Sequence, residues 1–174
     1  MKSILFPIMC MALCCALSCK KGSDSNTPET NAKTFKIEIS TATNINNDVL
    51  LKLINDTRLA GCKCGTVTMP PVGALTWNVN LGAAAIYQGK YIASIKSLVH
   101  TSANGETVGD RVTATGYTWT TVGENLASGQ TSETQVFNEW IVSESHCKNI
   151  MNASFKEMGA AKTDNYWVQV FAAK

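Results

Sequence analysis

Apolar residues recur with helical spacing in three segments of the chain, and the first of these is residues 48–60. Asn47 can cap this predicted helix and Gly61 can end it, while Arg58 falls in the last turn, where a cation is favourable. Its apolar residues form one stripe, made of Val49, Leu50, Leu53 and Ile54. The pattern predicts an amphipathic helix that packs against a core.

A second helix is predicted from Asn80 to His100. Its apolar residues near one face are Leu81, Ala84, Ala85, Ile92, Ile95 and Val99. A third helix begins at Ser132, which fits a capping box with Gln135. Its inward-facing residues are Val136, Phe137, Trp140 and Ile141.

Strand patterns lie at the two ends of the folded region. Residues 35–39 alternate apolar and polar side chains and predict a short strand. Residues 155–162 and 165–173 predict two more strands, with the turn-forming pair Asp164-Asn165 near their connection. Helices followed by terminal strands predict an α+β fold, in which helices are layered against an antiparallel sheet.

The segments between these elements are rich in turn-forming residues. Residues 61–78 contain glycines and a Pro-Pro pair and are predicted to form a loop, as are residues 118–129. Residues 100–117 predict a turn and then a short helix with Asp110 in its first turn. Residues 143–152 follow the third helix and carry one of the two histidines of the chain.

The N-terminus has the pattern of an export signal. Lys2 precedes the apolar residues 4–17, a stretch that suits a signal peptide and is too short for a comfortable membrane span. Ala16-Leu17-Ser18 before Cys19 resembles a bacterial lipobox, so we expect residues 1–18 to be removed and Cys19 to be lipidated. An ordinary signal peptide cut nearby, or an uncleaved anchor, is the alternative.

The segment after Cys19 is predicted to be a tether. Residues 20–34 contain no large apolar side chain, which predicts a flexible chain. With the lipidated Cys19 they form a segment, 19–34, that precedes a domain at 35–174. The residue after Cys19 is Lys20 rather than Asp, and by resemblance to lipoprotein sorting rules nothing demands retention in an inner membrane. We therefore expect an extracytoplasmic lipoprotein of the bacterial cell envelope, at the outer membrane.

The charge of the chain argues against a nucleic-acid partner. The formal net charge is +2, and removal of the one charge of Lys2 with the signal peptide leaves +1. A net charge this small does not indicate a basic surface of the kind that binds nucleic acid. The remaining length suits a single domain, which we expect to be a monomer held to the membrane by its lipid.

Three cysteines remain after Cys19, an odd number in an oxidising compartment. Cys62 and Cys64 are too close in sequence for an easy mutual bridge, so one of them is expected to pair with Cys147. A zinc site built from the same residues and His146 is the rival, although a Cys-x-Cys spacing is tighter than structural zinc sites use. A nucleophilic Cys147 activated by His146 is disfavoured, because sequence neighbours point apart on a helix or strand.

An ordered set of short motifs carries a family resemblance. The motifs are Leu-Thr-Trp-Asn at 75–78, His-Thr-Ser-x-x-Gly at 100–105, Asp110-Arg111, Gly-Tyr at 116–117, Gly-Glu-Asn-Leu-Ala at 123–127, Trp140, Ser-Glu-x-His at 143–146, Lys-Asn-Ile-Met at 148–151 and Gly159. In this order they resemble the CAP superfamily, which comprises cysteine-rich secretory proteins, antigen 5 and pathogenesis-related 1 proteins, in its short bacterial form. The resemblance covers about residues 47–172.

The resemblance implies an α-β-α sandwich, with an antiparallel sheet between helical layers and a central cleft. Carried over residue by residue, it implies that His100, Glu124, Glu144 and His146 face one another in that cleft. The eukaryotic pattern would place the second acid at Ser143, whereas the bacterial pattern places it at Glu144, which we prefer; a three-residue site is the alternative. The resemblance also favours Cys64–Cys147 as the bridge, with Cys62 as the spare thiol.

Two imidazoles with a carboxylate can hold a divalent metal, so we expect His100, His146 and Glu124 to bind one, with Zn²⁺ ahead of softer transition metals. The resemblance further implies a non-enzymatic binding module, with a small apolar ligand. A metal-assisted hydrolase, acting on peptides or cell-wall polymers with Glu124 as base, is the second hypothesis. A third is a domain whose four polar residues form only a buried network.

Overall fold

The computed structural model describes residues 35–174. The predicted signal peptide, the lipidated Cys19 and the tether up to residue 34 lie outside the described residues. Within the described part of the chain, no helix is both long and apolar enough to cross a membrane.

The centre of the domain is a four-stranded sheet with the order β3-β5-β6-β4. Its strands are β3 (Thr76–Trp77), β4 (Thr121–Ser128), β5 (Glu157–Thr163) and β6 (Tyr166–Ala173). β6 pairs antiparallel with both of its neighbours, and only the short β3 runs parallel to its partner. β4 and β6 pair along their full length, which sets Glu124 opposite Val170.

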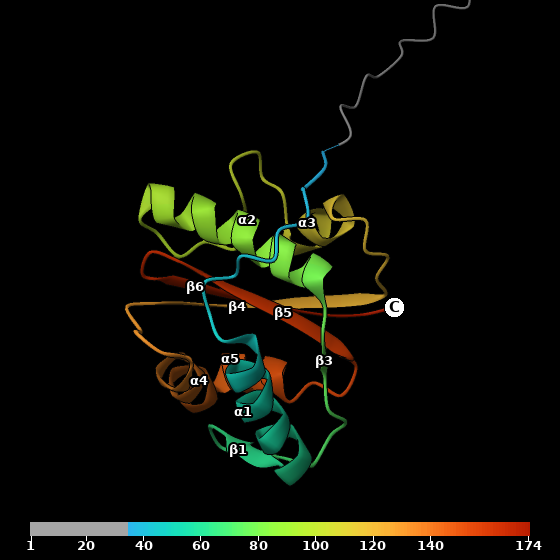
Figure 1. The fold of residues 1–174 in the computed structure, drawn as a ribbon. Helices are drawn as coiled ribbons and strands as arrows, with labels where there is room; N and C mark the ends of the chain where they lie inside the picture. Colours follow the sequence, from blue (N-terminus) through green and yellow to red (C-terminus); the bar gives the residue numbers. More distant parts are fainter. Residues whose placement is uncertain (1–34) are drawn as a thin grey trace, which may run out of the picture. The chain divides into compact units, whose positions relative to one another are not determined.

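Helices cover both faces of this sheet (Figure 1). α2 (Val79–Ile95) and α3 (Val108–Ala114) lie on one face, whereas α1 (Asn47–Ala60), α4 (Glu133–Val142) and α5 (Glu144–Ile150) lie on the other. A small hairpin of β1 (Cys62–Cys64) and β2 (Val67–Met69) lies beside α1 and α5. The predicted α+β fold, with a sheet among helices, is confirmed.

The alternation of β6 explains the two cores. Val168 and Val170 pack into the cluster under α2, while Trp167 and Phe171 pack into the cluster under α1, α4 and α5. Since a strand points successive side chains to opposite faces, a sheet covered on both faces must be apolar at nearly every position. β6 satisfies this, because all of its residues after Tyr166 are buried.

The α2 helix packs directly on β5 at a pair of glycines. A Cβ atom added to Gly159 would clash with the backbone nitrogen of Gly82 and would lie 2.5 Å from the carbonyl carbon of Leu81. These contacts are with backbone, which cannot rotate away. The approach of helix to strand therefore requires glycine at position 159.

The β4 strand has a neighbour on one side only, because it is the edge of the sheet. On its other side, two backbone carbonyls accept side-chain hydrogen bonds from the helices below. Trp140 Nε1 donates to the carbonyl of Leu126 at 3.3 Å, and Asn149 Nδ2 donates to that of Glu124 at 3.2 Å. Helices α4 and α5 thus cover part of the strand edge.

Arg58 holds three segments together from the last turn of α1. Its guanidinium is fully buried and donates to the carbonyls of Gly73 at 2.8 Å, Ile150 at 2.6 Å and Asn152 at 3.0 Å. A further bond reaches the carbonyl of Phe155. Burial lowers the pKa of Arg58. The cation was expected only to complement the helix terminus, and its carbonyl partners show why it is instead a core residue.

Several predicted elements are confirmed with shifted ends. α1, α3, α4, β5 and β6 are all present, and Gly61 ends α1 with a left-handed backbone at φ 75°. The caps move by one or two residues, since Asn46 caps α1 and Asn78 caps α2. Ser132 caps α4 as predicted, but the Gln135 side chain accepts from Thr131 rather than from Ser132.

Other predicted elements are wrong. Residues 35–39 form no strand; Ile37 N donates a single backbone bond to Ala114, and nothing extends it into a ladder. The second helix ends at Ile95, where Lys96 adopts a left-handed conformation, so His100 lies in the connection beyond it. The predicted loop at 118–129 contains β4, and the loop at 61–78 contains β1, β2 and β3. Residues 144–150 form the unexpected α5.

Candidate functional site

Glu124 lies near the middle of β4, and its side chain points to the face covered by α2 and α3. Both carboxylate oxygens are engaged: Oε1 is 2.8 Å from His100 Nδ1, and Oε2 accepts from Arg111 at 2.6 Å. The carboxylate is 1% exposed and the guanidinium 0%, whereas the imidazole is 63% exposed. A buried acid therefore links a buried cation to an imidazole at the surface.

Arg111 fixes the loop that carries His100. Its Nη1 atom contacts the carbonyls of His100 at 3.1 Å and Glu106 at 2.9 Å, and the hydroxyl oxygen of Ser102 at 3.1 Å. Ser102 in turn donates to Gln88 at 2.8 Å. The loop after α2 thus takes its conformation from one guanidinium, and the Ser102 hydroxyl is held inside this network.

The two charges beside His100 act on it in opposite directions. The hydrogen bond to Glu124, together with that residue's negative charge, raises the pKa of His100, while burial and the Arg111 charge partly oppose the rise. With Glu124 on Nδ1, the imidazole leaves Nε2 for another partner. Nδ1 carries the proton in this arrangement, because an ionised carboxylate only accepts.

His146 lies in α5, on the opposite side of the β4 edge from α3. Its backbone carbonyl accepts from Asn125 Nδ2 at 3.2 Å, which attaches α5 to β4. Its Nδ1 atom is buried without a hydrogen-bond partner. Burial and the charge of His100 lower the pKa of His146, and Glu139 opposes this. His146 is thus a neutral imidazole within electrostatic reach of His100.

Glu144 makes its contacts elsewhere. Its carboxylate lies 2.5 Å from Lys148 Nζ, one helical turn on, and is about half exposed. It also lies over Gly65 in the β1–β2 turn, where an added Cβ would clash with the Glu144 carboxylate. Residues two apart on a helix face in nearly opposite directions, so Glu144 and His146 leave α5 on different sides.

The three domain cysteines do come together. Cys64 and Cys147 form a disulfide, and Cys62 Sγ lies 3.6 Å from Cys147 Sγ and 3.9 Å from Cys64 Sγ. Within residues 35–174, these sulfurs are the one group of three metal-ligand atoms within 4.8 Å of one another. They would offer three thiolates only after reduction. His100, Glu124 and His146 do not form such a group in this structure.

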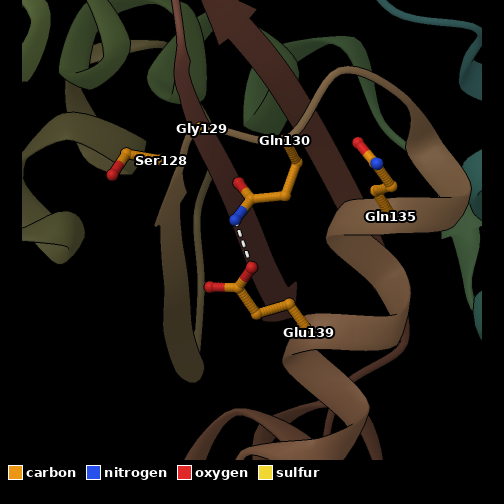
Figure 2. Close-up of a pocket in the computed structure, with 5 residues that line it drawn as sticks. All are labelled: Ser128, Gly129, Gln130, Gln135 and Glu139. Carbon is orange, nitrogen blue, oxygen red and sulfur yellow. Dashed lines mark hydrogen bonds between the residues drawn. The ribbon is translucent and has the colours of Figure 1, made fainter.

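A polar hollow of about 420 Å³ opens at the end of β4 (Figure 2). It is lined by Ser128, Gly129, Gln130, Gln135 and Glu139. The Gln130 amide donates to the Glu139 carboxylate across the hollow. His146 is not among the residues that line this hollow.

Comparison with known proteins identifies the family. Residues 51–171 match the model of the cysteine-rich secretory protein family, CAP. The chain belongs to the CAP family. A stretch of 67 residues is 36% identical to protein YkwD of Bacillus subtilis. The matched stretch covers 37% of this chain and 26% of that protein. The chain thus spans about a quarter of the length of this relative.

Solved CAP structures share the fold. An extracellular protein with an SCP domain from Bacillus anthracis aligns with a TM-score of 0.65 at 24% identity, over 74% of this chain and 40% of that one. An outer surface protein from Borrelia burgdorferi aligns with a TM-score of 0.60 at 22% identity, over 73% of this chain and 91% of that one. These likenesses establish the CAP fold.

Two residues of the site were not assigned a role from the sequence. Arg111 was noted only as part of a motif, although it lies three residues after Val108 and beside Val112, on the buried side of a short helix, where a cation needs hydrogen-bond partners. Glu139 precedes the fully buried Trp140, and no periodic signal distinguishes it from a surface acid. In this CAP domain Glu124 is hydrogen-bonded to His100, whereas the charge of Glu139 only raises the pKa of His146.

Proposed function

We propose that this chain is an extracytoplasmic binding module whose two histidines, at the edge of β4, hold a divalent metal. The observation that carries the proposal is the hydrogen bond between His100 Nδ1 and Glu124. A carboxylate on one ring nitrogen fixes the tautomer and orientation of an imidazole and raises the basicity of the other nitrogen, as in metal-ligating histidines. The same bond leaves Nε2 of His100 available to a metal.

The residues present fit a two-imidazole site better than a three-ligand site. His146 supplies a second, neutral ring, with a buried nitrogen that has no protein partner. Glu124 has both oxygens engaged by Arg111 and His100. We therefore assign Glu124 the role of orienting His100 from outside the coordination sphere, and leave the remaining positions to water or to a ligand of the module. A bound Zn²⁺ would supply a Lewis acid there.

The same contacts give the hydrolase hypothesis no support. A general base must be free to take a proton from water. The carboxylate of Glu124 is instead inaccessible and paired with a buried guanidinium. We accordingly place binding ahead of catalysis, and the small apolar ligand stays a prediction.

Calorimetric titration with Zn²⁺ tests the metal site. The measurement is made in a Cys62→Ser background, so that the free thiol contributes no binding. We expect one site per chain, lost in the double variant His100→Ala, His146→Ala. Glu144→Gln serves as the matched control and should bind as the parent does. Equal Zn²⁺ affinity in the parent and the double-histidine variant would remove the proposal.

The location is a separate proposal. We infer that Cys19 carries the lipid and holds the domain at the outer side of a bacterial membrane. The support is the apolar leader that ends at Cys19, together with the solved relatives described as extracellular or outer-surface proteins. Detergent phase partitioning should send the native protein into the detergent phase and a variant that lacks residues 1–19 into the aqueous phase. Mass spectrometry that finds an unmodified Cys19 in the native protein would contradict this assignment.

A further inference from the structure

The sulfur cluster holds one thiol more than its disulfide uses. Cys62 and Cys64 lie two residues apart on β1, and successive side chains of a strand alternate between faces. Both thiols therefore point the same way, toward α5 and Cys147, while the exposed Lys63 between them points outward. The Cys-x-Cys sequence places two equivalent partners before a single cysteine.

The distances place the spare thiol against both sulfurs of the disulfide. Cys62 Sγ lies 3.6 Å from Cys147 Sγ while Cys64 is bonded to it. Cys62 is also 3.9 Å from Cys64, so its sulfur lies beside the disulfide rather than beyond one end of it. Attack in line with the bond then requires the Cys62 sulfur to leave its place beside the disulfide and to approach Cys147 from the side opposite Cys64.

We propose that Cys62 and Cys64 exchange as the partner of Cys147, so that the domain holds two disulfide isomers. The Cys62 thiolate attacks Cys147 Sγ, the Cys62–Cys147 bond forms, the Cys64–Cys147 bond breaks, and the electron pair leaves on Cys64. The proton that Cys62 lost is taken up at Cys64. No oxidant or reductant is consumed, because one disulfide and one thiol are present before and after.

The exchange moves the free thiol between two environments. In the described isomer the thiol is Cys62, which is half-buried, and burial raises its pKa. In the other isomer the thiol is Cys64, whose position is completely buried. Either isomer keeps α5 attached to β1, so the attachment survives while the reactive sulfur is withdrawn from solvent.

Disulfide mapping tests the exchange in the full chain. The four N-terminal cysteines are first replaced by Cys10→Ser, Cys14→Ser, Cys15→Ser and Cys19→Ser. This parent is incubated at pH 8.5 without added thiol, quenched in acid, alkylated and digested without reduction. We expect peptides of both isomers, with populations within about tenfold of each other. N-ethylmaleimide added before the incubation should hold the two isomers at their starting ratio, because it alkylates the free thiol that exchange needs.

A second variant probes the alternative bond directly. In this parent, Cys64→Ser should oxidise to a Cys62–Cys147 disulfide. Ellman's reagent should then detect no free thiol. The map of the parent decides the matter, whether or not this variant folds. If the Cys62–Cys147 peptide is more than about tenfold rarer than the Cys64–Cys147 peptide after incubation, the two partners are not interchangeable and the proposal is overturned.

Discussion

The buried pair of Glu124 and Arg111 allows a test of the site that needs no ligand. The substitution Glu124→Gln keeps the size of the side chain and removes its charge. It leaves a guanidinium that is 0% exposed without a carboxylate. Removing one partner of a buried ion pair costs about 3–5 kcal/mol, and the glutamine carbonyl can still accept one bond. We therefore expect the free energy of unfolding to fall by about 3 kcal/mol.

The same substitution should change His100. Its hydrogen bond to Glu124 is the largest cause that raises its pKa, and the carboxylate charge adds to it. The pKa of His100 should consequently fall in Glu124→Gln. The chain has only two histidines, so a proton NMR titration resolves both.

Urea unfolding at pH 7 gives the stability, provided that the slope m stays the same. Glu144→Gln is the matched control, because its carboxylate is about half exposed and pairs with Lys148 one turn away. An exposed pair of this kind is worth about 0.3–0.5 kcal/mol. If Glu124→Gln costs no more than Glu144→Gln and leaves the titration of His100 unmoved, then Glu124 neither pairs with Arg111 nor orients His100 in solution.

Four further predictions follow from single contacts. Arg58→Met should lower the free energy of unfolding, measured in urea, by about 3 kcal/mol, because charge-assisted hydrogen bonds to three chain segments are lost. A loss below about 1 kcal/mol would show that Arg58 does not hold these segments together. Cys147→Ser opens a bridge with a sequence separation of 83, and should cost about 4.5 kcal/mol by the loop-entropy relation, measured against a Cys62→Ser control that should cost little. Gly159→Ala should cost about 3 kcal/mol or more, since its Cβ meets backbone of α2; a melting temperature equal to that of the parent would show that the helix can move away. The pKa of His100 is raised in the folded state above its unfolded value of about 6.5, so protonated His100 should stabilise the fold by about 0.2–1 kcal/mol at this exposure. This stabilisation should be full below pH 6.5 and should disappear as the pH rises through the folded pKa. A difference in unfolding free energy between the parent and His100→Asn that widens with pH would have the wrong sign.

The sequence predicted those elements whose packing follows one simple period. α1 and α4 carry apolar stripes between recognisable caps, and β5 and β6 flank an Asp-Asn turn, so local signals were sufficient. β4 was missed because its central residues, Glu124 and Asn125, are polar. Their partners, Arg111 and Gln169, lie elsewhere in the sequence, and no local pattern shows that a buried acid and amide will be satisfied.

The site shows the same limit. The family resemblance directed attention to His100 and Glu124, which the structure joins by a hydrogen bond. Arg111 was noted without a role, because its importance depends on burial. Glu144 was chosen by its spacing from Trp140, but helix α5, which was not predicted, turns its side chain toward Lys148 and Gly65. Residue spacing locates a segment, whereas the secondary structure of that segment decides where each side chain points.

The covered edge of β4 has a consequence for how these domains coexist at high density. An uncovered edge strand invites a strand of another molecule to add to the sheet, which leads to aggregates. Here the indole of Trp140 and the amide of Asn149 already occupy two of the carbonyls that such a strand would need. A second molecule approaching this edge would therefore have to displace both donors before its strand could pair with β4 along its length.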